Sequence, residues 1–175
     1  MLSFWAKSTL AATSLAPMLI CYALLYAGAE PRVSGALIIV AIALVAVCRL
    51  LLGEVQKHIP EKPIHLDSVK IADQQMLTYI IAYLLPLVFA KLMEPTAPRL
   101  GLLVFVFVLL TVALYRSNGY SFNPVMGLCF GYHFYEITTA KNFTYVVVSK
   151  RKIVNTKGPL RGKELSPYMF LEAEG

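Results

Sequence analysis

Four long apolar runs occupy most of the first two thirds of this 175-residue chain, and none has an acidic residue in its middle. They cover roughly residues 8–29, 33–52, 75–93 and 100–115. At 1.5 Å of rise per residue, a helix over each run approaches the ~30 Å thickness of the hydrocarbon core of a bilayer. The runs therefore predict a small polytopic membrane protein with four transmembrane helices.

The overall composition agrees with that class. Hydrophobic residues make up 58% of the chain and the mean hydropathy is +0.65, whereas a soluble domain is nearer half apolar. Residues 117–175 carry seven basic and four acidic residues. That excess of positive charge is too weak for a nucleic-acid domain, so we expect no direct binding of nucleic acid.

Basic residues are distributed unevenly between the two sides that four spans would create. The N-terminus, the loop of residues 53–74 and the C-terminal tail share one side, which holds 13 Lys and Arg residues against three on the other. Cytoplasmic loops are enriched in Lys and Arg. The asymmetry predicts a multi-pass protein with both its N- and C-termini in the cytoplasm.

The character of the chain changes after residue 116, and we place a domain boundary there. Residues 1–116 would form the transmembrane domain, and residues 117–175 a cytoplasmic tail. In the tail, Asn123-Pro124 resembles the cap of a short apolar segment. Aromatic and β-branched residues predict strands at 132–138, 143–149 and 168–171. The predicted fold class is an all-α membrane bundle of four transmembrane helices with a small cytoplasmic β-rich C-terminal tail.

The loop of residues 53–74 is polar and is interrupted by Pro60 and Pro63. Asp67 is a plausible helix cap, so we expect the third helix to begin near Ser68 and to stand partly in the cytoplasm as a stalk. Pro86 lies inside that helix and is the candidate site of a kink, because proline cannot donate the backbone hydrogen bond.

The first apolar run contains small residues at every fourth position. Ser8, Ala12 and Ala16 would share one helix face, and such a face lets two helix backbones approach closely in lipid. We regard it as a candidate helix-packing face, within a subunit or between subunits. A chance spacing is an equally good explanation, since Ala and Ser are common in spans.

A basic cluster in the tail is the most informative polar feature. Three interpretations are open: a topology signal, a surface attracted to anionic headgroups, or a docking face for an acidic partner or nucleic acid. As candidate contacts of a partner or of anionic lipid we select Lys150, Arg151, Lys152, Lys157, Arg161 and Lys163.

The chain shows no recognisable catalytic or cofactor motif. It lacks a nucleophile elbow, a P-loop, a zinc-protease helix and a Cys-x-x-Cys pair. His58 and His65 share a loop with acidic residues, but their spacing does not define a metal site. The three cysteines have no ligand spacing, which is typical of free thiols. We expect no enzyme activity, no metal and no cofactor.

Three stretches of the tail, residues 131–136, 145–150 and 167–171, together with the predicted layout, resemble the membrane subunits of the Kiwa anti-phage defence system, the KwaA family. The resemblance implies a non-enzymatic sensor of the bacterial inner (plasma) membrane. It implies a homo-oligomer, a tetramer, that perceives perturbation of the membrane during infection. It also implies a soluble cytoplasmic partner, KwaB, that binds DNA.

Three functions are therefore compared. The first is a non-enzymatic sensor and scaffold that oligomerises and recruits a cytoplasmic effector in anti-phage defence. The alternative is a small oligomeric channel or transporter, against which the lack of charge inside the apolar runs argues. The third is a lipid-modifying enzyme, for which only the loop that carries His58 and His65 offers chemistry. We favour the first.

Overall fold

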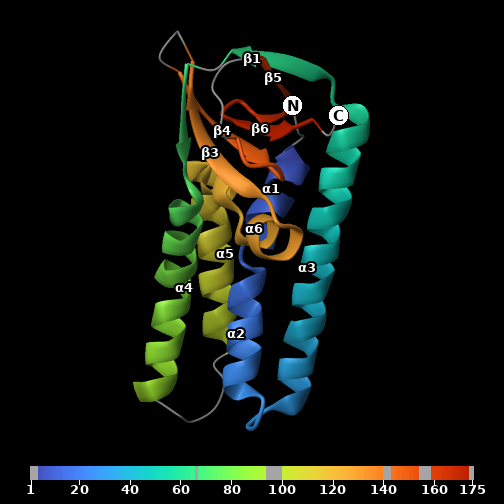
Figure 1. Ribbon diagram of the computed structural model, residues 1–175. Coiled ribbons are helices and arrows are strands. Elements are labelled where there is room, and N and C mark those ends of the chain that lie inside the picture. The colour runs from blue at the N-terminus through green and yellow to red at the C-terminus, as the bar shows by residue number, and fades with distance from the viewer. Residues whose placement is uncertain (1–3, 66, 94–99, 140–142, 154–158, 174–175) are drawn as a thin grey trace.

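A computed structural model describes residues 4–65, 67–93, 100–139, 143–153 and 159–173. The helices form an elongated bundle, and a six-stranded sheet covers one end of it (Figure 1). Helix α1 begins and strand β6 ends at this sheet end of the molecule. The two layers share one hydrophobic core that includes buried residues from α1, α3, α6 and the sheet.

The helices and strands follow one another in an α-rich first part and a β-rich last part, with a pair of strands between. The helices are α1 (Phe4–Thr13), α2 (Ala16–Tyr26), α3 (Pro31–His58), α4 (Asp73–Met93), α5 (Leu100–Ser117), the 3₁₀ turn η1 (Gly119–Phe122) and α6 (Pro124–Phe130). The strands are β1 (Glu61–His65), β2 (Ser68–Ile71), β3 (His133–Thr138), β4 (Thr144–Ser149), β5 (Pro159–Ser166) and β6 (Met169–Glu172).

The first apolar run is interrupted where α1 passes into α2. Pro17 has no N–H to donate to the carbonyl of Thr13, four residues earlier, so a regular α-helix cannot continue through it. The chain makes a tighter turn there instead, in which the Leu15 N–H donates to the Ala12 carbonyl at 3.1 Å. The sequence shows this proline, but we did not predict the break.

The sheet is mixed, with the strand order β1-β5-β6-β4-β3-β2. Strands β4 and β6 are parallel, and the other neighbouring pairs are antiparallel. Strands β1 and β2 lie at opposite edges although only residues 66 and 67 separate them. In a flat sheet, five interstrand spacings would separate the two edge strands by about 24 Å. The chain from the end of β1 to the start of β2 can span only about 11 Å. The sheet must therefore curl until the two edges meet at one end.

The curl explains why the tail strands are apolar on both faces. Phe134, Val148 and Leu171 belong to the core shared with the helices. Their neighbours Val147 and Phe170 belong to a second cluster that also includes Ile64, Tyr135 and Ile137. Because successive side chains of a strand point to opposite faces, one face packs on the bundle and the other lies inside the curl.

The predicted fold class is wrong. The chain is not an all-α bundle of four spans with a β tail, because a six-stranded sheet takes strands from the middle of the chain as well as from its end. Among the described residues, only Ala6–Tyr26 and Pro31–His58 are long and apolar enough to cross a membrane. The apolar stretch Gly101–Ser117 is shorter. Two such helices support association with a membrane.

The helical stalk predicted to begin near Ser68 is also wrong. Residues 68–71 form β2, which pairs with β3 in the register Val69 opposite Ile137. Helix α4 begins only at Asp73. The reason lies in the tertiary structure. The edge of β3 offers hydrogen-bond partners to the backbone of this short segment, and no local pattern in the sequence predicts that pairing.

Several elements of the tail are confirmed. The predicted hairpin at 132–138 and 143–149 is β3 and β4, and the predicted strand at 168–171 is β6 with a shift of one residue. Asn123 caps α6 as expected. Strand β5 was missed, because its charged and glycine-containing sequence lacks the alternation that marks a strand. The domain boundary after residue 116 stays a prediction.

Candidate functional site at the junction of helices and sheet

Asn123 is completely buried where α6 meets α1 and α3, and its amide nitrogen lies 4.0 Å from Cys48 Sγ on α3. Its amide nitrogen Nδ2 donates to the Leu10 carbonyl at 3.2 Å and to Thr13 Oγ1 at 2.9 Å. Its oxygen Oδ1 accepts from the Val125 N–H at 2.9 Å. One side chain thus joins the end of α1 to the start of α6.

The break between α1 and α2 supplies the polar groups that Asn123 meets. The Thr13 hydroxyl donates to the Leu10 carbonyl at 2.8 Å, and the Ser14 hydroxyl donates to the Ala11 carbonyl at 2.6 Å. Both side chains are buried. A break inside an apolar bundle is tolerated only where such neighbours satisfy the backbone. The result is a polar joint in the middle of an apolar core.

A second junction attaches the end of α3 to the sheet. The amide nitrogen Nε2 of Gln56 donates to the Glu172 carbonyl on β6 at 3.1 Å. The Lys163 ammonium on β5 donates to the Gln56 carbonyl. A positive charge near the last carbonyls of a helix is also favoured by the helix dipole. The longest helix is therefore tied to two central strands.

A third junction attaches the start of α4 to β3. Asp73 Oδ1 accepts from the Phe134 N–H at 2.7 Å, and Oδ2 lies 3.0 Å from Nδ1 of His133. The Ala72 N–H donates to the Phe134 carbonyl at 2.8 Å. A side chain on the first turn of α4, Gln75, donates to Glu136. This helix cannot move along its axis without disturbing β3.

Two cation–aromatic pairs lie beside the end of α6. The Arg49 guanidinium carbon is 5.8 Å from the ring centroid of Phe130, and the Lys150 ammonium is 5.3 Å from that of Tyr132. Both cations are exposed. Phe130 ends α6, and Gly131, in the left-handed conformation with φ 69°, turns the chain into β3. The pairs bring α3, α6 and the end of β4 together.

The structure separates the members of the predicted basic cluster. Arg151 contacts Glu172 at 3.0 Å, Arg161 lies 3.9 Å from Glu61, and Lys163 holds Gln56. Lys150 and Lys152 are exposed at the end of β4. Lys157 lies outside the described residues. The cluster as a set of partner or lipid contacts stays a prediction.

The predicted packing residues are placed on the first two helices. Ser8 and Ala12 on α1 are half-buried and Ala16, the first residue of α2, is buried. Helix α1 packs against α3 and α5. Pro86 lies within α4. The packing face and the kink at Pro86 stay predictions.

The histidines do not come together. His58 pairs with Glu54 one turn earlier on α3, at 3.1 Å, and His133 pairs with Asp73. The side chain of His65 lies outside the described part of the chain. Within that part, no group of three or more His, Cys, Asp or Glu side chains is arranged to hold a metal ion. No described residues suggest a cofactor site.

The comparison with protein families shows the family to which the chain belongs. The family model described as anti-phage protein KwaA matches residues 6–171. This chain belongs to the KwaA family. The match extends over the helices, the polar joint and most of the sheet, and it confirms the resemblance seen in the tail. Neither the curated proteins nor the solved structures provide a match to this KwaA-family chain.

The residues that build the junctions were largely missed from the sequence. Asn123 was recognised as a cap of α6 but not as a partner of α1, which lies 110 and more positions away. Gln56 and Glu172 carry no local signal, because a single Gln or Glu near a helix or strand end is usually a solvated residue. Pro17 was the one available sign of the broken span.

Proposed function

We propose that this chain is a non-enzymatic sensor and scaffold of the bacterial inner membrane in anti-phage defence. It works as a homo-oligomer, a tetramer, and recruits a soluble, cytoplasmic, DNA-binding effector of the Kiwa system that resembles KwaB. Membership of the KwaA family supports the role in defence. The finer parts of the proposal rest on the arrangement of helices and sheet.

The observation that carries the proposal is a set of three polar junctions: α3 and α4 are each bonded to the sheet, and α1 is bonded to α6, which leads into it. Asn123, Gln56 and Asp73 each connect a helix to the sheet or to the segment that leads into it. A tilt or shift of the spans in a perturbed bilayer must therefore strain the sheet. Transmission of this kind needs an element with two arrangements that the stimulus favours unequally.

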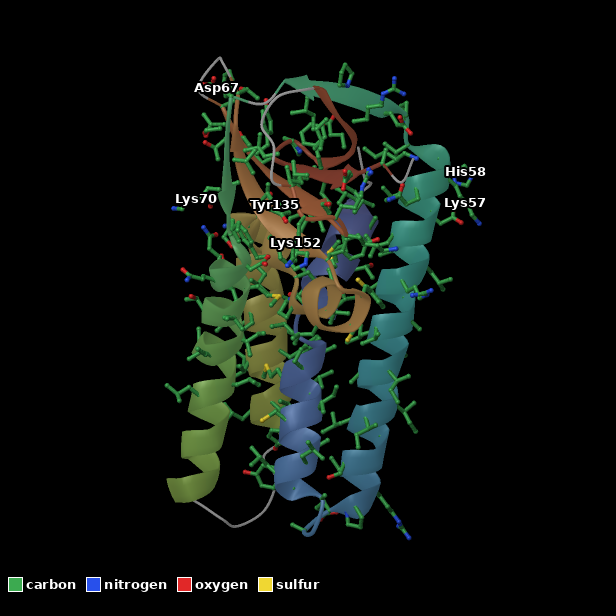
Figure 2. All side chains as sticks on the ribbon, viewed as in Figure 1. Lys57, His58, Asp67, Lys70, Tyr135 and Lys152 are labelled. Atoms are coloured by element: carbon green, nitrogen blue, oxygen red, sulfur yellow. The ribbon has the colours of Figure 1, made fainter. Side chains whose placement is uncertain are left out.

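The distribution of surface residues supports the orientation. The outward face of α3 exposes apolar side chains, with Ile39, Ile42 and Leu50 each more than 60% accessible. Lys57 lies at the sheet end of α3 and Lys70 on β2, as Figure 2 shows. Positive charge favours the cytoplasmic side. We therefore place the sheet, and both ends of the chain, in the cytoplasm.

The test is a purification of the tagged chain in a mild detergent after expression with its chromosomal neighbours, read by native mass spectrometry. A discrete oligomer that retains one soluble, DNA-binding protein is the expected result. A monomer without a partner contradicts the proposal. Ion or solute flux through liposomes that hold the purified oligomer would instead favour the channel.

A matched pair of variants sharpens this test. Gln56→Ala removes the side-chain bond from α3 to Glu172 on β6, whereas Gln74→Ala alters an exposed residue on the first turn of α4. We expect the first to reduce protection against phage in a plaque assay while the protein remains in the membrane. The second should protect like the unmodified chain. Equal protection by both would show that the side-chain bond from Gln56 to Glu172 transmits nothing.

A further inference from the structure

Arg49 marks the point at which the surface of α3 changes from apolar to polar. The helix carries no charged residue from Val33 to Cys48, and beyond Arg49 it carries Glu54 and Lys57. Arg32, at the other end, is 17 positions from Arg49, which corresponds to about 26 Å along the axis. That separation is close to the ~30 Å of a hydrocarbon core. Arg49 therefore lies at the headgroup level on the side of the sheet.

Helix α6 ends at the same level, because Phe130 packs under the Arg49 guanidinium. Leu128 on α6 is 61% accessible, and Leu50 on α3, next to Arg49, is 69% accessible. Two large apolar side chains thus stay uncovered, one next to Arg49 in the sequence and the other two positions before Phe130. Among the described residues, no carboxylate lies within 4.0 Å of Arg49.

Lys150 adds a second cation next to α6. It lies over the ring of Tyr132, two positions after Phe130 in the chain. Its neighbour Lys152 is also exposed, and Figure 2 places Lys152 at the side of the sheet that adjoins the bundle.

We propose that Arg49 and Lys150, each stacked on an aromatic ring beside α6, bind the phosphate headgroup of an anionic phospholipid. The lipid belongs to the leaflet that faces the sheet, and Leu50 and Leu128 contact its acyl chains. A guanidinium presents a planar fork to phosphate oxygens, and an aromatic ring below holds it in place. A soluble anion would leave both leucines in water. The site rests on the proposed membrane location, and it specifies the class of lipid that the sensor binds.

Thermal unfolding of the full-length protein in a mild detergent tests the site. Phosphatidylglycerol is added in one series, and phosphatidylcholine with the same acyl chains in another. We expect phosphatidylglycerol to raise the melting temperature by about 2–4 °C at a few times its dissociation constant. Phosphatidylcholine should raise it much less. An equal rise with both lipids, or an equal rise with inorganic phosphate, overturns the proposal.

Matched variants locate the effect. In Arg49→Gln with Lys150→Gln we expect the phosphatidylglycerol shift to disappear. Lys57→Gln with Lys70→Gln removes the same charge from exposed positions on α3 and β2, and should keep the shift. Retention of the full shift by the first pair overturns the proposal.

A measurement on the unmodified protein covers the case in which the first pair does not fold. Native mass spectrometry should find anionic phospholipid retained on the chain in preference to zwitterionic lipid, and the opposite preference overturns the proposal. Lipid retention does not depend on the effector. Loss of the effector with lipid binding intact would therefore count against the proposed function alone.

Discussion

At the scale of single residues, Asn123 forms hydrogen bonds in two directions. Its oxygen caps α6 through Val125, and its amide donates to Leu10 and Thr13 at the break of the first span. The Leu10 carbonyl also accepts from the Thr13 hydroxyl and from the Ser14 N–H. The joint is therefore a shared network, to which Asn123 contributes from outside the first two helices.

The first prediction separates the two roles of Asn123. Asn123→Ala removes the cap and the amide, and we expect a loss of about 1–2 kcal/mol in the free energy of unfolding. Asn123→Ser keeps an oxygen that caps α6 but lacks the amide, and should lose less. Unfolding by denaturant in detergent measures both. If Ala and Ser lose the same amount, the cap contributes nothing.

The second prediction concerns Asp73 at the start of α4. Asp73→Ala leaves the Phe134 N–H without its carboxylate partner and His133 without its acceptor. We expect a loss of about 1–3 kcal/mol in the free energy of unfolding. Asp73→Asn keeps an oxygen for the Phe134 N–H and should lose less. A melting temperature unchanged by the Ala substitution contradicts the described junction.

At the scale of elements, the one glycine of α6 lets this helix pack closely against α4 and β3. A Cβ atom on Gly127 would collide with the Met76 sulfur and would lie 3.4 Å from Phe134 Cε2. Met76 comes from α4 and Phe134 from β3, so the absence of a side chain lets α6 approach both. A Cβ atom on Gly53, inside α3, would meet no other part of the described chain within 4 Å. Close packing therefore requires a glycine at position 127, whereas the surroundings of Gly53 have room for a side chain.

The third prediction compares these glycines. Gly127→Ala should destabilise the protein by about 1 kcal/mol, because the buried Met76 side chain must shift to admit the added methyl group. Gly53→Ala should stabilise it by about 0.5–1 kcal/mol, because alanine loses less backbone freedom in a helix. Thermal unfolding in detergent measures the sign of each change. If Gly127→Ala stabilises the protein, α6 does not pack against α4 and β3 as described.

At the scale of the whole molecule, the sheet is the element that joins distant parts of the chain. Strand β2 comes from the segment between α3 and α4, and β3 from the segment after α6. Val69 on β2 faces Ile137 on β3, and Ile137 faces Tyr145 on β4. The middle segment is thus a structural part of the sheet rather than a solvated loop.

The fourth prediction tests this pairing by disulfide formation, in a chain whose Cys21, Cys48 and Cys129 are replaced by Ala. Val69→Cys with Ile137→Cys should cross-link, since directly opposed residues of antiparallel strands lie within reach of a disulfide. Val69→Cys with Tyr145→Cys places the thiols two strands apart, about 10 Å, and should not cross-link. Mass spectrometry of the digested protein identifies the linked peptides. Cross-linking of the second pair alone would contradict the strand order.

Particular residues show which parts of the fold could be predicted from the sequence. The uncharged stretch of α3, the Asn123-Pro124 cap and the aromatic and β-branched hairpin β3–β4 are local patterns, and each was predicted. Strands β1 and β5 have charged sequences without a strand pattern, and they form strands because they pair with each other and β5 pairs with β6. The candidate contacts Arg151 and Lys163 looked like free surface cations, and the fold gives each an internal partner.

By itself, therefore, the sequence determined the apolar helices, the hairpin of the tail, the capped short helix and the family. These depend on neighbours within a few positions, where periodicity and side-chain chemistry act directly. Only the tertiary structure decided the strand order, the curl of the sheet and the three polar junctions. Their partners lie from 60 to 116 positions apart, and which buried polar groups meet depends on how the whole chain packs.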